Sequence, residues 1–490
     1  MLFNSLNFVV FFPFVIAIYR FLPCRFRRAF LMIASLFFYG CFDIRSIPVL
    51  LGIILITYSA ANAMDRMETG RKAVMLAAVV LCLVTLGSFK YLSFIANNLN
   101  AVLSRIHISF VMPSLSLIIP AGISFYTFKA VGYVADVYRG KQKAEKNLVN
   151  YALFISFFPQ IVAGPIDRAD NLLRQINEPE GPDAEDFRTG ILLMLWGYFE
   201  KLVIADRISC IVDAVYNNHT SYSGAVIAYA TICYGIQIYA DFAGYSCISI
   251  GASRMLGFKI NDNFRQPYLA VDIKDFWSRW HISMSTWFRD YVYIPLGGNR
   301  KGRTRKYVNN MITFLLSGLW HGSSWNFVAW GGLHGIYHLI SGLTSDFRNR
   351  ISSQLKLDDN TFGRRLFKTL ATFIMVDYAW MFFRAGSLST AADMTKRIIT
   401  DFKLYTVSGD WMDALSLPLP EAALQSMLPA VIVLLMVDIL HERGFGFIKW
   451  LDKQGLIFRW ICYMGASLYI ILAAIQNLGL SSADFIYFRF

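Results

Sequence analysis

Apolar segments long enough to cross a lipid bilayer recur along almost the whole chain. A membrane-spanning helix needs about 20 predominantly apolar residues, because the hydrocarbon core of a bilayer is about 30 Å thick. About eleven segments approach that length, at 3–22, 29–44, 47–64, 73–95, 114–135, 187–210, 224–250, 307–343, 368–386, 425–441 and 457–477. With 56% hydrophobic and 16% charged residues, the chain cannot bury its apolar side chains in one soluble core. We therefore expect an all-α polytopic membrane protein.

The formal net charge of +13 has its origin in short loops between these segments. Basic loops lie at 25–28, 66–72, 139–146, 254–306, 347–368 and 441–459, and neutral or acidic loops at 97–113, 212–223 and 401–425. Lys and Arg accumulate in cytoplasmic loops. With the N-terminus outside, the two sets fall largely on opposite faces, provided that 147–166 does not fully cross. The charge therefore indicates topology, and we expect no nucleic-acid partner.

Three stretches depart from plain membrane-spanning helices. Segments 151–166 and 318–330 contain Pro or Gly together with polar residues, which predicts re-entrant or kinked helices lining a cavity, because irregular backbone cannot face lipid. Residues 251–306 alternate aromatic and charged residues, a pattern typical of amphipathic helices at the cytoplasmic surface. Anchoring to membrane lipids alone and an added role in admitting a phosphate-bearing cytosolic donor both remain open for this stretch.

Four of the seven histidines lie in or beside apolar segments: His281, His321, His334 and His338. An ionisable residue inside a membrane is costly and is therefore a candidate for function. His321 lies in GLWHGSSW, where small residues let helices approach or a cavity open. An imidazole in a low-dielectric pocket stays neutral, which suits a general base. The alternative is a structural histidine bonded to a helix carbonyl.

The remaining polar residues in apolar surroundings have weaker interpretations. His281 would orient an acceptor, bind a thioester carbonyl, or hold Asp275 or another neighbour. His334 and His338 share one helix face, and we expect packing or a helix–helix hydrogen bond from them, not a metal site. Asp241, inside segment 224–250, must be paired or line water. Its surroundings would form a channel wall or pin helices together.

Five motifs together resemble the membrane-bound O-acyltransferases. They are FFPQIVAGPI (157–166), QIYADFAGYS (237–246), NFRQPYLAVDIKDFWSRWHISMSTWFRDYVYIPLGGNR (263–300), GLWHGSSWNFVAWGGLHG (318–335) and FIYFRF (485–490). The closest likeness is to the bacterial branch that contains the membrane subunit of alginate O-acetylation. The resemblance covers nearly the whole chain.

The resemblance implies a fold and a site. The fold is a single membrane domain, 1–490, whose helices surround a cytoplasmic funnel. It has N-terminal helices at 1–146, a catalytic core at 147–345 with interfacial helices at 251–306, and C-terminal helices at 346–490. His321 matches the family's membrane histidine and His281 its second, upstream polar residue. The side chains expected to contact the substrates are Gln237, Asp241, Trp280, Arg289, Trp320 and Asn326.

The resemblance also implies a reaction in a bacterial inner membrane. An acetyl group passes from a cytoplasmic donor, acetyl-CoA or another activated donor such as an acyl-carrier protein, to an extracytoplasmic polysaccharide such as alginate, and no cofactor or metal stays bound. The expected external loops are short, so we expect a relay through an SGNH-type acetyltransferase or another polysaccharide-modification subunit. His321 would take the proton of the attacking hydroxyl, and His281 would polarise the carbonyl or stabilise the oxyanion. The rival functions are a transporter or flippase, which usually shows two related halves that this sequence lacks, and a non-catalytic subunit of a secretion complex.

Overall fold

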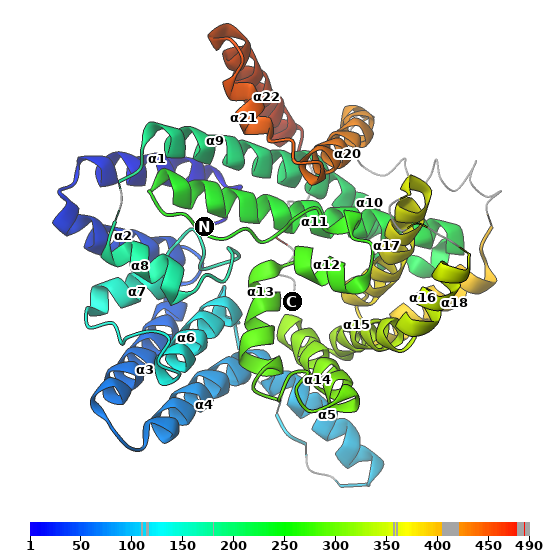
Figure 1. The fold of residues 1–490 in the computed structure, drawn as a ribbon, viewed down its shortest axis with the longest axis horizontal. Helices are drawn as coiled ribbons and strands as arrows, with labels where there is room; N and C mark the ends of the chain where they lie inside the picture. The colour runs from blue at the N-terminus through cyan, green and yellow to red at the C-terminus, as the bar shows by residue number, and fades with distance from the viewer. Residues whose placement is uncertain are drawn as a thin grey trace. The chain divides into compact units, whose positions relative to one another are not determined.

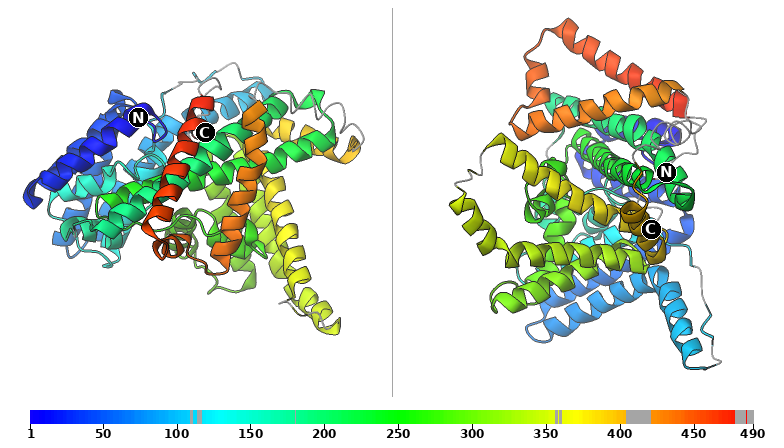
Figure 2. Two further views of the ribbon diagram at one scale, coloured as in Figure 1. Left: turned by 90° about the horizontal axis from the view of Figure 1, so that it is seen from above. Right: turned by 90° about the vertical axis from the view of Figure 1, so that its right-hand side faces the viewer.

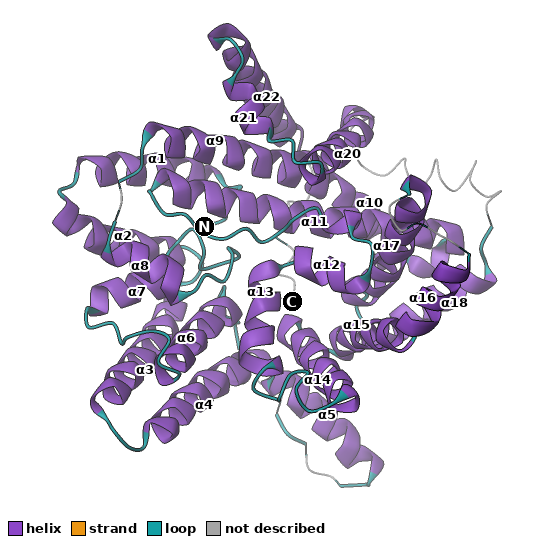
Figure 3. Cartoon of the chain, in the orientation of Figure 1, coloured by secondary structure: helices purple, strands orange, loops and turns teal. Residues whose placement is uncertain are grey.

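A computed structural model describes residues 1–108, 111–113, 117–179, 181–355, 358, 361–403, 421–477 and 485. Within these residues the chain is built from helices and the loops between them, with no strand (Figure 3). The expected all-α fold is confirmed. Of the C-terminal FIYFRF motif only Phe485 is described, and most of the predicted loop 401–425 also lies outside the described residues.

Five helical segments of the described chain are long and apolar enough to cross a membrane. They are Ile44–Arg66, Arg71–Lys90, Gly224–Met255, Phe362–Arg384 and Leu456–Gln476. Each coincides with a segment expected from the sequence, and the shorter helix α1 (Leu6–Phe21) is also apolar. The polytopic class is thus confirmed, while the number of eleven crossings stays a prediction.

The chain divides into two compact units, and the first comprises residues 1–194 and 248–261. Its helices, blue to green in Figure 1, are α1, α2 (Cys24–Gly40), η1 (Ile44–Ser46), α3 (Ile47–Arg66), α4 (Arg71–Lys90), α5 (Leu92–Arg105), α6 (Ile123–Tyr138), α7 (Leu148–Ser156), the π-helix η2 (Ala169–Leu173), α8 (Arg174–Asn177) and most of α9 (Ala184–Tyr198). Helix α7 ends at Ser156, and turns follow through 157–164. A side chain at Gly164 would collide with the backbone of Gln160, so the turn needs glycine. The predicted break in segment 151–166 is confirmed.

The second unit comprises residues 195–247 and 262–490. Its helices are the π-helix η3 (Phe199–Ala205), α10 (Asp206–Asn217), η4 (His219–Ser221), most of α11 (Gly224–Met255), η5 (Pro267–Leu269), α12 (Ile273–Arg279), α13 (Ile282–Phe288), the π-helix η6 (Arg289–Tyr293), α14 (Arg303–His321), α15 (Trp325–Leu343), α16 (Ser345–Gln354), α17 (Phe362–Arg384), α18 (Leu388–Thr400), α20 (Glu421–Glu442), α21 (Phe447–Asp452) and α22 (Leu456–Gln476). Helices α20 and α22, orange and red in Figure 2, both pack against η3.

Helices α14 and α15 of this unit form a close antiparallel pair (Figure 1). A Cβ at Gly318 would meet the carbonyl of Phe327, and one at Gly331 would meet the carbonyl of Phe314, so only glycine allows this approach. Residues 322–324 leave the helical conformation between them. The predicted break in 318–330 is therefore confirmed, and it is a tight reversal between two helices.

Residues 251–306 form short helices, as expected, but five of their aromatic side chains are buried in the protein. Phe276, Trp280 and Phe288 are at most 5% exposed, and Trp277 and Trp287 are also buried. The expectation that these rings lie at the lipid surface is wrong for these five. Tryptophan suits a protein core as well as a membrane interface, and the sequence pattern does not separate the two.

Candidate functional site

His321 is the last residue of α14, at the reversal into α15, and is 4% exposed. Its ring lies 5.0 Å from that of Trp330 and 5.2 Å from that of Phe383, both nearly perpendicular to it (centroid distances). Gly322 follows it with no room for a side chain, because a Cβ there would overlap the Phe327 ring. The imidazole is therefore held inside an aromatic cage by the close α14–α15 pair and by α17.

His281 lies between α12 and α13 and is fully buried. Its ring centroid is 6.4 Å from that of His321, so the structure brings together two residues that are 40 positions apart in the sequence. Its Nδ1 is 3.1 Å from Oδ1 of Asn263. Of the alternatives left open by the sequence, the hydrogen-bonding partner in the structure is Asn263, while Asp275 bonds to Arg279. Burial lowers the pKa of His281 to about 3, so its ring is neutral.

The two predicted tryptophans lie in the same aromatic cluster. The Trp320 ring lies 6.1 Å from His281, and Trp280 lies 4.9 Å from Trp380 of α17. Both are at most 3% exposed. The two buried histidines therefore lie among buried rings, in surroundings of low dielectric constant where electrostatic interactions are stronger than in water.

Asp241 and Gln237 lie one turn apart on α11 and are both buried. Asp241 forms an ion pair with Lys201 at 2.7 Å, and Lys201 forms a second ion pair with Asp206 at 2.8 Å. The requirement that Asp241 be paired is thus confirmed. No described residue forms a hydrogen bond with Oε1 of Gln237.

Asn326 is used to join helices. Its Nδ2 donates to the carbonyl of Ala385 at 2.8 Å and to that of Phe382 at 3.2 Å, at the end of α17. Ser324 donates to its Oδ1. Both polar atoms of the Asn326 side chain, Oδ1 and Nδ2, therefore have hydrogen-bond partners within the protein. In the structure, Asn326 joins α15 to the end of α17.

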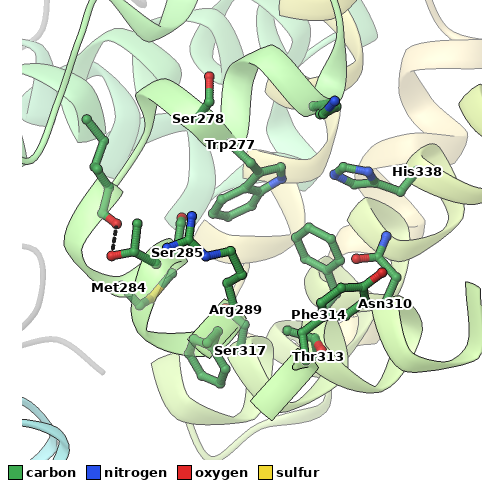
Figure 4. Close-up of a pocket in the computed structure, with 15 residues that line it drawn as sticks. Trp277, Ser278, Met284, Ser285, Arg289, Asn310, Thr313, Phe314, Ser317 and His338 are labelled. Atoms are coloured by element: carbon green, nitrogen blue, oxygen red, sulfur yellow. Dashed lines mark hydrogen bonds between the residues drawn. The ribbon is translucent and has the colours of Figure 1, made fainter. Parts of the chain in front are cut away.

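A pocket of about 440 Å³ opens among α12, α13, η6, α14 and α15 (Figure 4). Its lining is Lys274, Trp277, Ser278, Ile282, Met284, Ser285, Thr286, Phe288, Arg289, Tyr293, Asn310, Thr313, Phe314, Ser317 and His338. Ile282 directly follows His281, and Ser317 lies one helical turn before His321, so the pocket reaches the elements that carry both histidines. The cationic side chains of the lining are Lys274 and Arg289, and Arg289, whose side chain is 60% exposed, forms an ion pair with Asp290 at 2.8 Å. The predicted Arg289 therefore belongs to the pocket, whereas neither histidine lines it.

His334 and His338 differ in their surroundings. Trp277 Nε1 donates a hydrogen bond of 3.2 Å to His334 Nδ1 and so joins α12 to α15, which confirms the expected helix–helix bond. His338 lines the pocket beside Phe314, whose ring lies 5.0 Å from it (Figure 4). Among the described residues, no group of three His, Cys, Asp or Glu side chains could hold a metal ion.

Sequence reasoning missed three buried polar residues. Asn263 was quoted only as part of a motif, and its contact with His281 depends on the fold. Lys201 lies in the expected span 187–210 and Asp377 in the expected span 368–386, and both are buried. The cost of a charge in an apolar span is the signal that could have found them.

These features define a class: a polytopic membrane protein with two buried histidines in one aromatic cluster and a pocket lined by the helices next to them. Residues 144–379 match the model of the membrane-bound O-acyltransferase family. The chain belongs to that family and is an O-acyltransferase.

Two groups of relatives carry names that concern acetyl transfer. The chain is 35% identical to a Pseudomonas putida protein named probable alginate O-acetylase, over 80% of this chain and 79% of that protein. It is 31% identical to the peptidoglycan O-acetyltransferase of Helicobacter pylori, over 76% and 74% of the two chains. A more distant likeness, 29% over 55% of this chain, is to the teichoic acid D-alanyltransferase of Bacillus subtilis.

Proposed function

We propose that this O-acyltransferase moves an acetyl group from cytoplasmic acetyl-CoA across the bacterial inner membrane for O-acetylation of an extracytoplasmic polysaccharide. The observation that carries the proposal is the pair of buried histidines, His281 and His321, with ring centroids 6.4 Å apart. The relatives named O-acetylase and O-acetyltransferase support acetyl as the acyl group. Alginate is the acceptor polymer favoured by the most similar of these relatives.

His321 acts as the general base. It takes the proton of the acceptor hydroxyl while the hydroxyl oxygen attacks the thioester carbonyl, the C–S bond breaks, and the leaving thiolate receives that proton. Neither protein nor solvent supplies a further reactant. The aromatic cage supports this role, because it holds the imidazole in a fixed position near His281.

The pocket receives the donor. Lys274 and Arg289 are suited to the phosphates of acetyl-CoA, while Trp277 and Phe314 offer apolar surface to its thioester arm. Replacing Arg289 with Ala should raise KM for acetyl-CoA about 10-fold through the loss of a charge-assisted hydrogen bond, with kcat nearly unchanged. Arg300→Ala is the matched control, because Arg300 is not in the pocket lining. Equal KM values for the two variants would exclude this donor position.

The decisive experiment measures thiol release from acetyl-CoA by purified protein in vesicles that enclose the partner transferase and polymer. His321→Ala should lower thiol release about 10²–10⁴-fold while the protein stays in the membrane. His107→Asn, a change at an exposed loop histidine, should match the wild type. Thiol release that persists without His321 would refute the catalytic assignment. Transport or scaffolding without catalysis predicts no thiol release from either protein.

The relay to a partner has its own test. We propose that an SGNH-type acetyltransferase or another polysaccharide-modification subunit takes the acetyl group on the outer face. Vesicles that contain this enzyme without the partner should leave the polymer unacetylated. Efficient acetylation by the enzyme alone would show that no partner is needed.

A further inference from the structure

Asn263 is a buried amide that ties His281 to helix α11. It lies between α11 and α12 and is 1% exposed. Its Nδ2 donates to Oγ of Ser246 on α11 at 3.3 Å. Its Oδ1 lies 3.1 Å from His281 Nδ1, 3.3 Å from the backbone N of Ser283 and 2.9 Å from Oγ of Ser283. Its own carbonyl also accepts from the backbone N of Ile282, at 3.0 Å. One residue thus contacts both the ring of His281 and the backbone that follows it.

These contacts determine which amide atom faces the imidazole. A backbone N–H can only donate, so the Asn263 atom that faces the N–H of Ser283 is the carbonyl oxygen. The same oxygen faces Nδ1 of His281, and a carbonyl oxygen can only accept. Nδ1 therefore carries the proton. Because the buried ring is neutral, its other nitrogen, Nε2, has a lone pair and no proton.

The backbone of His281 has a strained conformation that is more common at functional sites than elsewhere. Its φ angle is +44°, in the left-handed region that residues other than glycine rarely adopt. Such a conformation costs free energy and persists only where the surroundings fix it, often at functional sites. The bonds from Ile282 and Ser283 to Asn263 fix it here.

We propose that Asn263 is a positioning residue for acyl transfer: it holds His281 as the Nδ1–H tautomer, so that Nε2 accepts a hydrogen bond from an O–H or N–H group of the substrates. The inference rests on the proposed function and changes one part of the expected mechanism. A nitrogen without a proton has nothing to donate to an oxyanion. His281 therefore orients a substrate donor group, and oxyanion stabilisation belongs to other groups.

The test is the pH profile of thiol release in Asn263→Asp and Asn263→Ala. A carboxylate beside Nδ1–H favours the imidazolium and raises the pKa of His281. Below that pKa the His281 ring has no lone pair to accept a hydrogen bond. The slope of log rate against pH on the acid side of the Asn263→Asp profile should therefore increase by one. Asn263→Ala should lose activity at every pH. The loss of such a partner costs metal-bound histidines about 10–100-fold, and we expect a similar range here. Asn218→Asp, the same change at an exposed asparagine, should leave the profile unchanged.

A purely structural role for Asn263 predicts a different result. It would give Asn263→Asp a uniform loss with the wild-type profile shape, and that result would overturn the proposal. Wild-type activity in both Asn263 variants would overturn it as well.

A spectroscopic measurement tests the tautomer without enzymatic activity and without any Asn263 variant. In protein labelled with ¹⁵N-histidine, the resonances that His281→Gln removes should have the shifts of the Nδ1–H tautomer. Shifts of the Nε2–H tautomer would refute the inference. If wild-type protein released no thiol from acetyl-CoA, the proposed function would fail, and these shifts would still decide whether Asn263 fixes the ring.

Discussion

Lys201 is the cation of a buried ion cluster, and its removal should destabilise the fold strongly. Its side chain is 1% exposed, and it contacts Asp241 at 2.7 Å and Asp206 at 2.8 Å. Lys201→Met keeps the length of the side chain but leaves two carboxylates buried without their cation. Breaking a buried ion pair from one side costs about 3–5 kcal/mol, and we expect a loss in that range.

Two comparisons separate charge from packing. Asp241→Asn leaves Lys201 paired with Asp206, so it should cost less, about 1–3 kcal/mol. The double variant Lys201→Met/Asp241→Asn removes the cation together with one carboxylate, and should be more stable than Lys201→Met alone. Lys146→Met is the matched control at a surface pair with Asp65, where solvent screens the charges and little change is expected.

The assay is equilibrium unfolding in detergent micelles, followed by tryptophan fluorescence, with thiol release measured on the same samples. The expected order of stability is Lys146→Met, then Asp241→Asn, then Lys201→Met. A Lys201→Met protein as stable as Lys146→Met would refute the reasoning about the buried cluster. If Asp241→Asn kept full stability and lost thiol release, Asp241 would act on the substrate, as the sequence predicts.

Three further predictions concern the histidines and the helix pair. Burial lowers the pKa of His281 from an ordinary 6.5 to about 3, so between pH 6.5 and pH 3 only the unfolded chain binds this proton, and the folded state loses stability as the pH falls. By pH 5 this loss is about 2 kcal/mol. Thermal unfolding at pH 7 and pH 5 should show a smaller loss of stability in His281→Gln than in the wild type. Gly331→Ala should destabilise by about 1–3 kcal/mol because its Cβ meets a backbone carbonyl of α14, whereas Gly332→Ala, which has room, should be neutral or stabilising in the same unfolding assay. Trp277→Phe removes the indole donor to the buried His334 and should cost about 1–3 kcal/mol in urea unfolding; an unchanged midpoint would show that this hydrogen bond contributes nothing.

Local signals in the sequence predicted the class of fold and the breaks in its helices. Glycine, proline and long apolar runs determine the conformation of their own stretch of the chain. The end of α7 and the reversal between α14 and α15 could therefore be located from residues within a few positions of each. The aromatic residues of 251–306 were assigned to the membrane surface, where several are in fact buried in protein. The hydrophobicity of a ring predicts that it is removed from water, but it does not distinguish burial in protein from burial in lipid.

The site itself needed information that acts over long distances. His321 stood out locally, whereas its nearness to His281 was expected only from the family resemblance, and Asn263 is an ordinary polar residue until the chain folds it against His281. The ion cluster is an intermediate case. A buried ammonium requires a buried anion, so a lysine in span 187–210 and an aspartate in span 224–250 already restrict each other's choice of partner at the level of the sequence. Requiring each charge in an apolar span to have an opposite one would have placed Lys201 among the candidate partners of Asp241, together with Arg188 and Arg207 of the same span. A neutral amide such as Asn263 gives no such requirement, because its hydrogen bonds can be satisfied by many partners.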